Sequence, residues 1–409
     1  MGELVRDLAA RRLLVVLLTA VAVLTLSGYL LKAQCIGHYN EIRDSNLCSN
    51  DIQVLYSERG MHEHPFPYVH GDLVNHQLTG GSVEYPVLTG VFAWLPALLV
   101  DDDGSYLQLT ALLLAPFTFL TAWLLGRMVK WRALIYALGP PLVWYSFHNW
   151  DLLVVCATVA ACHAWWRGRY AWAGALLAIG GGLKFWPLLF VVPLLLDRLA
   201  VADRRGATRA LTSTLGVTLA INLPFIVVNA KGWWAAYAFQ EERAADITSN
   251  SIWYWAFPSL TTDELNVLVP ALVVIGTVVA CFAGWLRRRP SFPFVQVCGA
   301  ILCAFLLANK AHSPQYALWL LPFFCLLRLR WGWWVAYLAI DVCFYVGLFR
   351  WYYAIGQGDT YGIAYQALVV GVWGRIVMLA LLFVVMLRSE TALGSEHERG
   401  QGQAVPAAA

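Results

Sequence analysis

The stretch LLVVLLTAVAVLTLSGYLL, residues 13–31, contains apolar and small side chains and no charged residue. An α-helix needs about 20 apolar residues to cross the hydrocarbon core of a bilayer, so this stretch predicts a membrane-spanning helix. Arg6, Arg11 and Arg12 precede it, as in a signal peptide. The apolar run is longer than that of a signal peptide, and no clear small-residue cleavage site follows it. We therefore expect a retained signal anchor with the N-terminus in the cytoplasm.

Similar apolar windows recur along the chain. Of its 409 residues, 60% are hydrophobic and only 13% are charged, which is too apolar for an ordinary soluble protein. The fold class we expect is an all-α polytopic membrane protein with about twelve transmembrane helices. The expected spans are residues 13–31, 106–127, 133–147, 152–166, 170–183, 186–199, 211–228, 266–286, 292–308, 316–327, 331–348 and 366–387.

Arginine and lysine cluster in short connections, including residues 127–132, 198–209 and 287–289. Placing every cluster in the cytoplasm satisfies the positive-inside rule and puts both termini inside. Residues 86–100 are apolar but short, and a crossing there would move all later clusters outside. We expect them to form a juxtamembrane helix at the outer surface. The net charge of +3 then reflects membrane orientation and does not indicate a nucleic-acid partner.

This topology divides the chain into a membrane domain, residues 1–389, and a disordered cytoplasmic tail, residues 390–409. Residues 32–105 form one large extracytoplasmic loop. Seven of the nine cysteines fall in expected spans, where a small buried apolar side chain is the simplest interpretation. Cys35 and Cys48 share the outer loop in an oxidising compartment. We expect a disulfide between them that fixes the segment just before Asp51.

Polar residues gather at the outer ends of the expected spans. They belong to four segments: the outer loop with Asp51, HNWD at residues 148–151, GLKFWP at residues 182–187, and NKAHSPQY at residues 309–316. Ionisable groups at such positions are costly to bury and are therefore functional candidates. Simpler alternatives remain open here. Asp51 can cap a short helix, Lys184 can extend to the headgroups, and His312 can bond a neighbouring helix end.

Motifs of soluble enzymes do not occur in the sequence, including phosphate-binding and dinucleotide-binding loops and the HExxH zinc motif. The spacing of the outer histidines matches no strong metal-ligand pattern. We therefore expect no metal and no cofactor. An enzyme with an acid, cations and a histidine beside lipid headgroups suits a lipid-linked phosphate substrate, because a carboxylate deprotonates the acceptor hydroxyl and cations stabilise the departing phosphate.

Five short motifs resemble, in order and spacing, the C-type (GT-C fold) integral-membrane glycosyltransferases, and among them glycosyltransferase family 87. They are NDIQVLY at residues 50–56, VEYPVLTGVFAWLP at 83–96, HNWDLLVV at 148–155, GGLKFWPLLFVVPLL at 181–195 and NKAHSPQYALWLLP at 309–322. Members of this family include actinobacterial mannosyltransferases and arabinofuranosyltransferases that use decaprenyl-phosphate sugars. The resemblance implies a polyprenyl-phosphate sugar donor, a glycolipid or glycan acceptor, and an active site on the outer face of the plasma membrane.

The chemistry of these segments and the resemblance together assign expected roles to residues. Asp51 corresponds to the catalytic base, in a metal-independent and inverting transfer. The donor phosphate is expected to contact Lys184, Lys310, His312, Gln315 and Tyr316. The acceptor or sugar is expected to contact Tyr56, Glu84, Tyr85, Asn149, Asp151 and Trp253. Mannose is the first candidate for the transferred sugar, which makes the enzyme a hexosyltransferase of cell-envelope biosynthesis.

Several alternatives stay open at this stage. Glu58, Asp72 and Glu84 are rival bases in the same outer loop. Asp341 and Arg375 lie inside expected spans, and we expect them to pair for structural reasons. An arabinofuranosyltransferase of the same fold is one alternative function. A lipid or sugar flippase is another, although a transporter favours polar or broken helices near the bilayer midplane.

Overall fold

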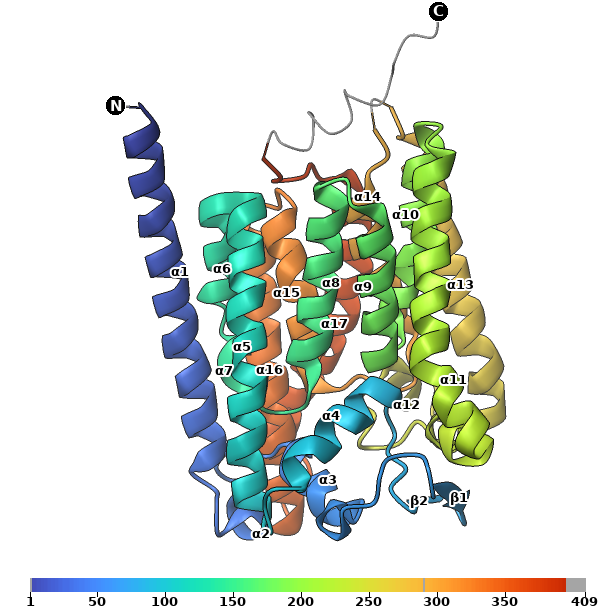
Figure 1. Ribbon diagram of the computed structural model, residues 1–409. Coiled ribbons are helices and arrows are strands. Elements are labelled where there is room, and N and C mark those ends of the chain that lie inside the picture. Colours follow the sequence, from blue (N-terminus) through green and yellow to red (C-terminus); the bar gives the residue numbers. More distant parts are fainter. Residues whose placement is uncertain (1, 290, 395–409) are drawn as a thin grey trace, which may run out of the picture.

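The computed structural model describes residues 2–289 and 291–394, and their regular secondary structure is almost entirely helical. Figure 1 shows the long helices side by side in one bundle. The N-terminal end of α1 (Gly2–Ala33) and the C-terminal end of α17 (Ile363–Arg388) lie at one end of the bundle. The short outer elements, among them α3 (Asp51–Glu58), gather at the other end. The expected all-α architecture is confirmed.

Six helical segments of the described chain are long and apolar enough to cross a membrane. They are α1, α5 (Asp103–Val129) with the turns that follow it, α11 (Arg204–Glu242), α13 (Thr262–Leu286), α16 (Trp331–Gly356) and α17. Shorter apolar helices pack between them. These are α8 (Asp151–Trp166), α9 (Tyr170–Leu183), α14 (Phe294–Ala308) and the segment of η4 (Pro314–Tyr316) and α15 (Ala317–Leu326). The count of twelve spans remains a prediction.

Residues 133–147, which we expected to form one helix, are broken into short pieces. They comprise the end of η2 (Lys130–Ala133), α6 (Leu134–Ala137) and α7 (Pro141–Tyr145). Pro140 and Pro141 explain the break, because proline lacks the N–H that continues a helix. Residues 186–199 likewise begin as η3 (Trp186–Phe190) and continue as α10 (Val191–Ala200).

Helix α11 is longer than expected and has a break at Asn229, whose backbone is not helical. The Asn229 side-chain amide donates to the carbonyl oxygens of Val69 and Gly71, at 3.1 and 3.0 Å. These carbonyls precede a two-stranded hairpin, β1 (Asp72–Val74) and β2 (Gln77–Thr79). At Gly232, an added Cβ would lie 2.0 Å from the Tyr68 carbonyl oxygen, so only glycine allows this close approach. The break therefore joins α11 to the outer loop.

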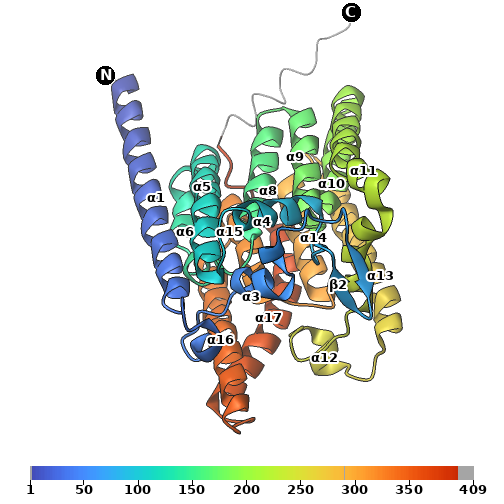
Figure 2. The same cartoon turned by 60° about the horizontal axis from the view of Figure 1, so that its bottom comes forward.

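The loop that we expect outside the membrane contains α2 (Tyr39–Ile42), α3, η1 (Met61–Glu63), the hairpin and α4 (Val87–Ala97). Figure 2 shows α3, α4 and the hairpin across the end of the bundle, with α12 (Ile252–Ala256) beside them. Helix α4 falls where we expected the juxtamembrane helix. Its depth in a bilayer remains a prediction.

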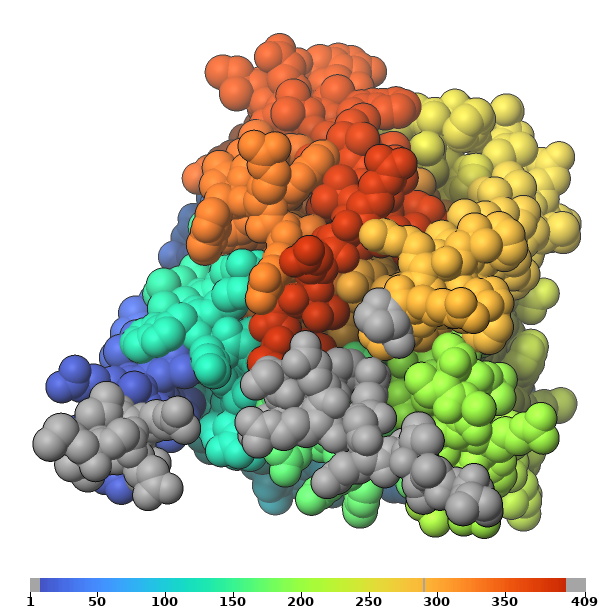
Figure 3. Space-filling view, turned by 90° about the horizontal axis from the view of Figure 1, so that it is seen from above, coloured from blue at the N-terminus to red at the C-terminus, as the bar shows by residue number. Residues whose placement is uncertain are grey.

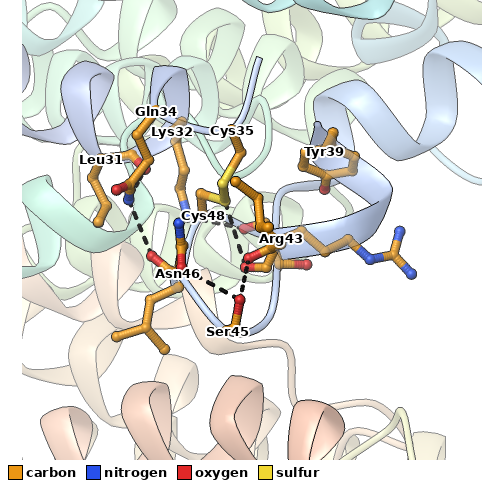
Figure 4. The surroundings of a disulfide bond; sticks show 12 residues. Leu31, Lys32, Gln34, Cys35, Tyr39, Arg43, Ser45, Asn46 and Cys48 are labelled. Carbon is orange, nitrogen blue, oxygen red and sulfur yellow. Dashed lines mark hydrogen bonds between the residues drawn. A yellow bond between two sulfur atoms is a disulfide. The ribbon is translucent and has the colours of Figure 1, made fainter. Parts of the chain in front are cut away.

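A disulfide joins Cys35, just after α1, to Cys48, two residues before the N-cap of α3. Both cysteines are fully buried, and Tyr39 packs against them. The Gln34 side-chain amide donates to the carbonyls of Leu31 and Asn46, which holds the loop against the end of α1 (Figure 4). Of the seven free cysteines, six are buried and Cys343 is half-buried.

The opposite end of the bundle joins segments that are far apart in sequence, as Figure 3 shows from that side. The Arg132 guanidinium donates to the carbonyls of Phe324, Cys325 and Leu327. Thr391 forms a β-bridge with Leu327, so the first residues of the expected disordered tail are ordered here. The rest of that expected tail, residues 395–409, lies outside the described residues.

Candidate active site

A cavity of about 620 Å³ opens among the outer segments. Its lining comes from each of the four polar segments found in the sequence. Lining residues include Asp51, Glu84, Tyr85, His148, Lys184, Arg243, Lys310, Gln315, Tyr316 and Trp319. The fold thus brings together side chains as far apart in the sequence as Arg43 and Tyr352.

Asp51 is the first residue of α3, and its carboxylate does not cap the helix. Asn50 is the N-cap, and its side-chain oxygen accepts from the Gln53 backbone N–H at 2.9 Å. Since Asn50 satisfies that donor, the Asp51 carboxylate is free to face the cavity. The capping role that the sequence left open belongs to Asn50.

Two neighbouring residues of the HNWD segment hold Asp51. The Asn149 amide donates to Asp51 Oδ2 at 2.7 Å, and Asp51 Oδ1 lies 3.9 Å from His148 Nε2. The Asp51 backbone N–H also donates to the His148 carbonyl at 2.7 Å. Burial raises the pKa of Asp51 above its ordinary value, while the Asn149 hydrogen bond and the nearby Lys184 charge oppose that rise. A carboxylate with a raised pKa is a stronger base than a free one.

Lys184 follows α9 and lies between Tyr85 and Asp151. Its Nζ is 4.0 Å from the centre of the Tyr85 ring and 3.5 Å from Asp151 Oδ1. Asp151 is fully buried, and Trp319 Nε1 also donates to its Oδ1 at 3.1 Å. Asn149 donates to the Tyr85 hydroxyl at 2.7 Å, which connects this cluster to Asp51. Asn149 and Asp151 therefore do not line the cavity themselves but contact the side chains that do.

Three further cations, Arg43, Lys310 and Arg243, line the cavity. Lys310 Nζ donates to the Glu241 carbonyl at 3.0 Å and to Asn266 Oδ1 at 2.6 Å, and burial lowers its pKa. Arg243 donates to Thr248 Oγ1 at 3.4 Å and forms no ion pair within the described residues. We did not select Arg243 from the sequence, although it stands in the outer loop QEERAAD that follows a run of aromatic residues.

The segment after Lys310 supplies neutral groups. Tyr316 stacks on Trp319 with ring centres 3.9 Å apart. Gln315 is buried, and its side-chain oxygen has no hydrogen-bond partner among the described residues. Arg375 donates to the Pro314 carbonyl at 3.2 Å, which anchors this segment to α17.

Besides Asn149 and Asp151, three more expected site residues do not line the cavity. The Tyr56 hydroxyl donates to the Val100 carbonyl, and Trp253 Nε1 donates to the Ala308 carbonyl, so both are packing residues here. His312 Nδ1 lies 3.3 Å from the Leu306 carbonyl, and burial lowers its pKa to about 3. A neutral, buried imidazole outside the cavity lining does not supply the cation that we expected at this position.

The rival bases differ from Asp51 in their surroundings. Glu84 lines the cavity but receives two hydrogen bonds from Arg59, at 2.9 and 3.2 Å. Asp72 lies in β1 and does not line the cavity. Glu58 is at the rim, where 58% of its side chain is exposed. Among residues 2–289 and 291–394, no group of three or more His, Cys, Asp or Glu residues is placed to hold a metal ion.

Residues 84–309 match the sequence model of glycosyltransferase family 87. This match covers more than half of the chain and includes Tyr85, the HNWD segment, Lys184 and Arg243. The chain is a membrane glycosyltransferase in class. It belongs to glycosyltransferase family 87. No curated protein and no solved structure matches it.

Proposed function

We propose that this glycosyltransferase moves a sugar, with mannose as the first candidate, from a polyprenyl-phosphate donor to a glycolipid or glycan acceptor. One observation carries the proposal: Asp51, a carboxylate held by the neutral amide of Asn149, shares one cavity with Lys184, Arg243 and Lys310. A base and a set of cations are the two components that sugar transfer from a lipid phosphate requires.

In the proposed reaction, the Asp51 carboxylate takes the proton of an acceptor hydroxyl. The acceptor oxygen forms a bond to the anomeric carbon while the bond from that carbon to the phosphate oxygen breaks. The phosphate keeps the electron pair and leaves on the polyprenyl chain. Attack opposite the leaving group inverts the anomeric carbon. All atoms and charges then balance without a metal or a cofactor.

The cations stabilise the negative charge that grows on the phosphate. Lys184 and Lys310 keep the roles predicted from the sequence, and Arg243 joins them because its guanidinium can bind two phosphate oxygens at once. Gln315 and Tyr316 offer polar groups to the donor on the same side of the cavity. His312 packs against Tyr316, with ring centres 5.8 Å apart, and so supports the segment that carries Gln315 and Tyr316.

We propose the outer face of the plasma membrane for this site, with both termini in the cytoplasm. The basic residues Arg132 and Arg328 lie at the bundle end away from the cavity, which supports this orientation. A reporter that works only outside the cytoplasm should be active when fused near Asp103 or Ala230. It should be inactive when fused near Arg204 or Arg288, and the reverse pattern would overturn the orientation.

The function is tested with the purified chain in liposomes that contain radiolabelled polyprenyl-phosphate mannose and total envelope glycolipid as acceptor. We expect label in the glycolipid fraction and release of polyprenyl phosphate, both absent with Asp51→Asn. Parallel reactions replace the donor with polyprenyl-phosphate arabinofuranose or with nucleotide-activated mannose. Transfer from the nucleotide sugar, or movement of the lipid donor across the bilayer without transfer, would contradict the proposal.

A further inference from the structure

A reciprocal set of hydrogen bonds joins residues 49–51 to His148 and Asn149. The Asp51 N–H donates to the His148 carbonyl at 2.7 Å, and His148 Nδ1 lies 2.9 Å from the Ser49 carbonyl. Asn149 donates to Asp51 Oδ2. The two carboxylate oxygens are thus in different surroundings: Oδ2 receives an amide donor, whereas Oδ1 faces His148 Nε2 at 3.9 Å.

The partner of Nδ1 fixes the tautomer of His148. A carbonyl oxygen only accepts hydrogen bonds, so Nδ1 must carry the proton that it donates to Ser49. In a neutral imidazole the other nitrogen, Nε2, is then an acceptor. Burial lowers the pKa of His148 well below its ordinary value, and the charges of Lys32 and Lys184 lower it further, so the ring stays neutral. The lone pair of Nε2 is therefore directed toward the Asp51 side of the site.

We propose that His148 is a positioning residue for the base: it fixes the Asp51 segment through Ser49, and its Nε2 accepts a hydrogen bond from Asp51 Oδ1–H once Asp51 has taken the acceptor proton. This inference rests on the proposed function. The proton stays on Asp51 Oδ1 throughout and is shared with Nε2 by a hydrogen bond only. The 3.9 Å separation must shorten by about 1 Å, as catalytic contacts commonly do when substrate binds.

Several cations surround the pair. Lys184, Arg243 and Lys32 act on Asp51 and favour its ionised form, as does the Asn149 donor. His148 is enclosed by the rings of Tyr145 and Phe349, with centres 6.3 and 5.8 Å away. Nε2 is the acceptor that faces Oδ1, so it opposes these cations by stabilising the protonated carboxyl. His148 thereby maintains the proton affinity of Asp51, although the cations that bind the phosphate lower it.

The test uses pH-difference infrared spectra of the full chain in lipid nanodiscs, without substrate. The carboxylic C=O band of Asp51 is the band that disappears in Asp51→Asn. His148→Asn retains an amide that can donate to Ser49 but has no atom at the Nε2 position. We expect the midpoint of the band to move to lower pH by about 0.5–1 unit, since one hydrogen bond to the protonated form is lost. Asn149→Ser should move it to higher pH, because a donor to the ionised form is weakened.

His312→Asn is the matched control, since it makes the same change at a buried histidine that does not face Asp51. An unchanged midpoint in His148→Asn, or an equal shift in His312→Asn, would overturn the proposal. If His148→Asn does not fold, the proposal is tested instead by nitrogen NMR of isotope-labelled histidine in the wild-type chain. One ring signal must report an unprotonated Nε2 and change as Asp51 titrates, with that change absent in Asp51→Asn. The absence of such a signal would also overturn the proposal.

These measurements separate two failures. If the chain transfers no sugar but the midpoint moves as expected, the proposed function fails and the His148 contact stands. If transfer depends on Asp51 but the midpoint does not move in His148→Asn, only the role of His148 fails.

Discussion

Asp51 and Asp341 are two carboxylates in the same apolar chain, and their surroundings differ. Asp341, on α16, has no exposed surface, pairs with Arg375 on α17 and accepts from the Tyr145 hydroxyl at 3.1 Å. Asp51 has the neutral partners Asn149 and His148, and 36% of its side chain is exposed to the cavity.

The difference shows how a structural acid is distinguished from the base that we propose. A buried carboxylate with a full counter-ion is already neutralised, and its pair links two helices. A carboxylate whose partners are neutral retains its charge and its affinity for a proton. Glu84 is intermediate, because it lines the cavity but is paired with Arg59.

Asp51→Asn tests the catalytic side of the comparison and should have the largest effect. Loss of a general base lowers turnover by roughly 10²–10⁴-fold. Because burial raises the pKa of Asp51 in the folded state, its contribution to stability is lost as pH rises through that pKa, and asparagine avoids this loss. The variant should therefore melt at the same or a higher temperature than wild type at neutral pH, and the gain should shrink on acidification. A variant with near-normal turnover would contradict the assignment.

Arg375→Met tests the structural side. It leaves the Asp341 carboxylate buried and without its counter-ion, which costs about 3–5 kcal/mol. Thermal unfolding in detergent should show a large loss of stability. The double variant Asp341→Leu with Arg375→Met should recover much of it, since no isolated charge remains. If the double variant is as unstable as the single one, the pair is not the main source of the effect.

Replacing Cys35 and Cys48 by serine tests whether Asp51 depends on its covalent support. The disulfide closes a loop with a sequence separation of 13, and its loss costs about 3 kcal/mol in the chain-entropy model. We expect lower stability and lower turnover. Cys298→Ser is a control that changes a buried free cysteine on α14. Equal turnover in the double-serine variant and wild type would show that the other contacts of Ser49 and Asp51 are sufficient.

Glu84→Gln should have the smallest effect. The amide keeps a hydrogen bond with Arg59 and loses part of the ion-pair energy. Turnover should fall less than 10-fold. A loss as large as that of Asp51→Asn, measured in the same transfer assay, would identify Glu84 as the base.

The sequence predicted the parts of this molecule that composition and charge control. Apolar windows predicted the helical class, and the Cys35–Cys48 disulfide and the pairing of Asp341 with Arg375 are present in the structure. The convergence of Asp51, the HNWD segment and Lys184 was also predicted, and these residues do meet in one cavity region.

Features that depend on packing were not predicted. The hydrophobic pattern predicted neither the break of α11 at Asn229 nor its continuation to Glu242. The break is stabilised by contacts of Asn229 with the distant carbonyls of Val69 and Gly71. Nor does a motif show which of its side chains faces the cavity. His312 lies in a motif with Lys310 and Gln315, yet the turn directs it to Leu306, whereas Arg243 reaches the cavity from a loop without a recognised motif.

The contacts of Lys32 connect residues that are synthesised early with a residue that is synthesised late. This residue, at the end of the first helix, is fully buried and donates to the Ser49 carbonyl at 2.9 Å and to the Tyr345 hydroxyl at 3.0 Å. The two ends of the latter contact are separated by 313 residues. During synthesis, almost the whole chain must therefore be made before Lys32 can contact Tyr345. The segment that carries Asp51 gains the Lys32–Tyr345 contact behind it only after α16 has been made, so the proposed catalytic centre is completed late in translation.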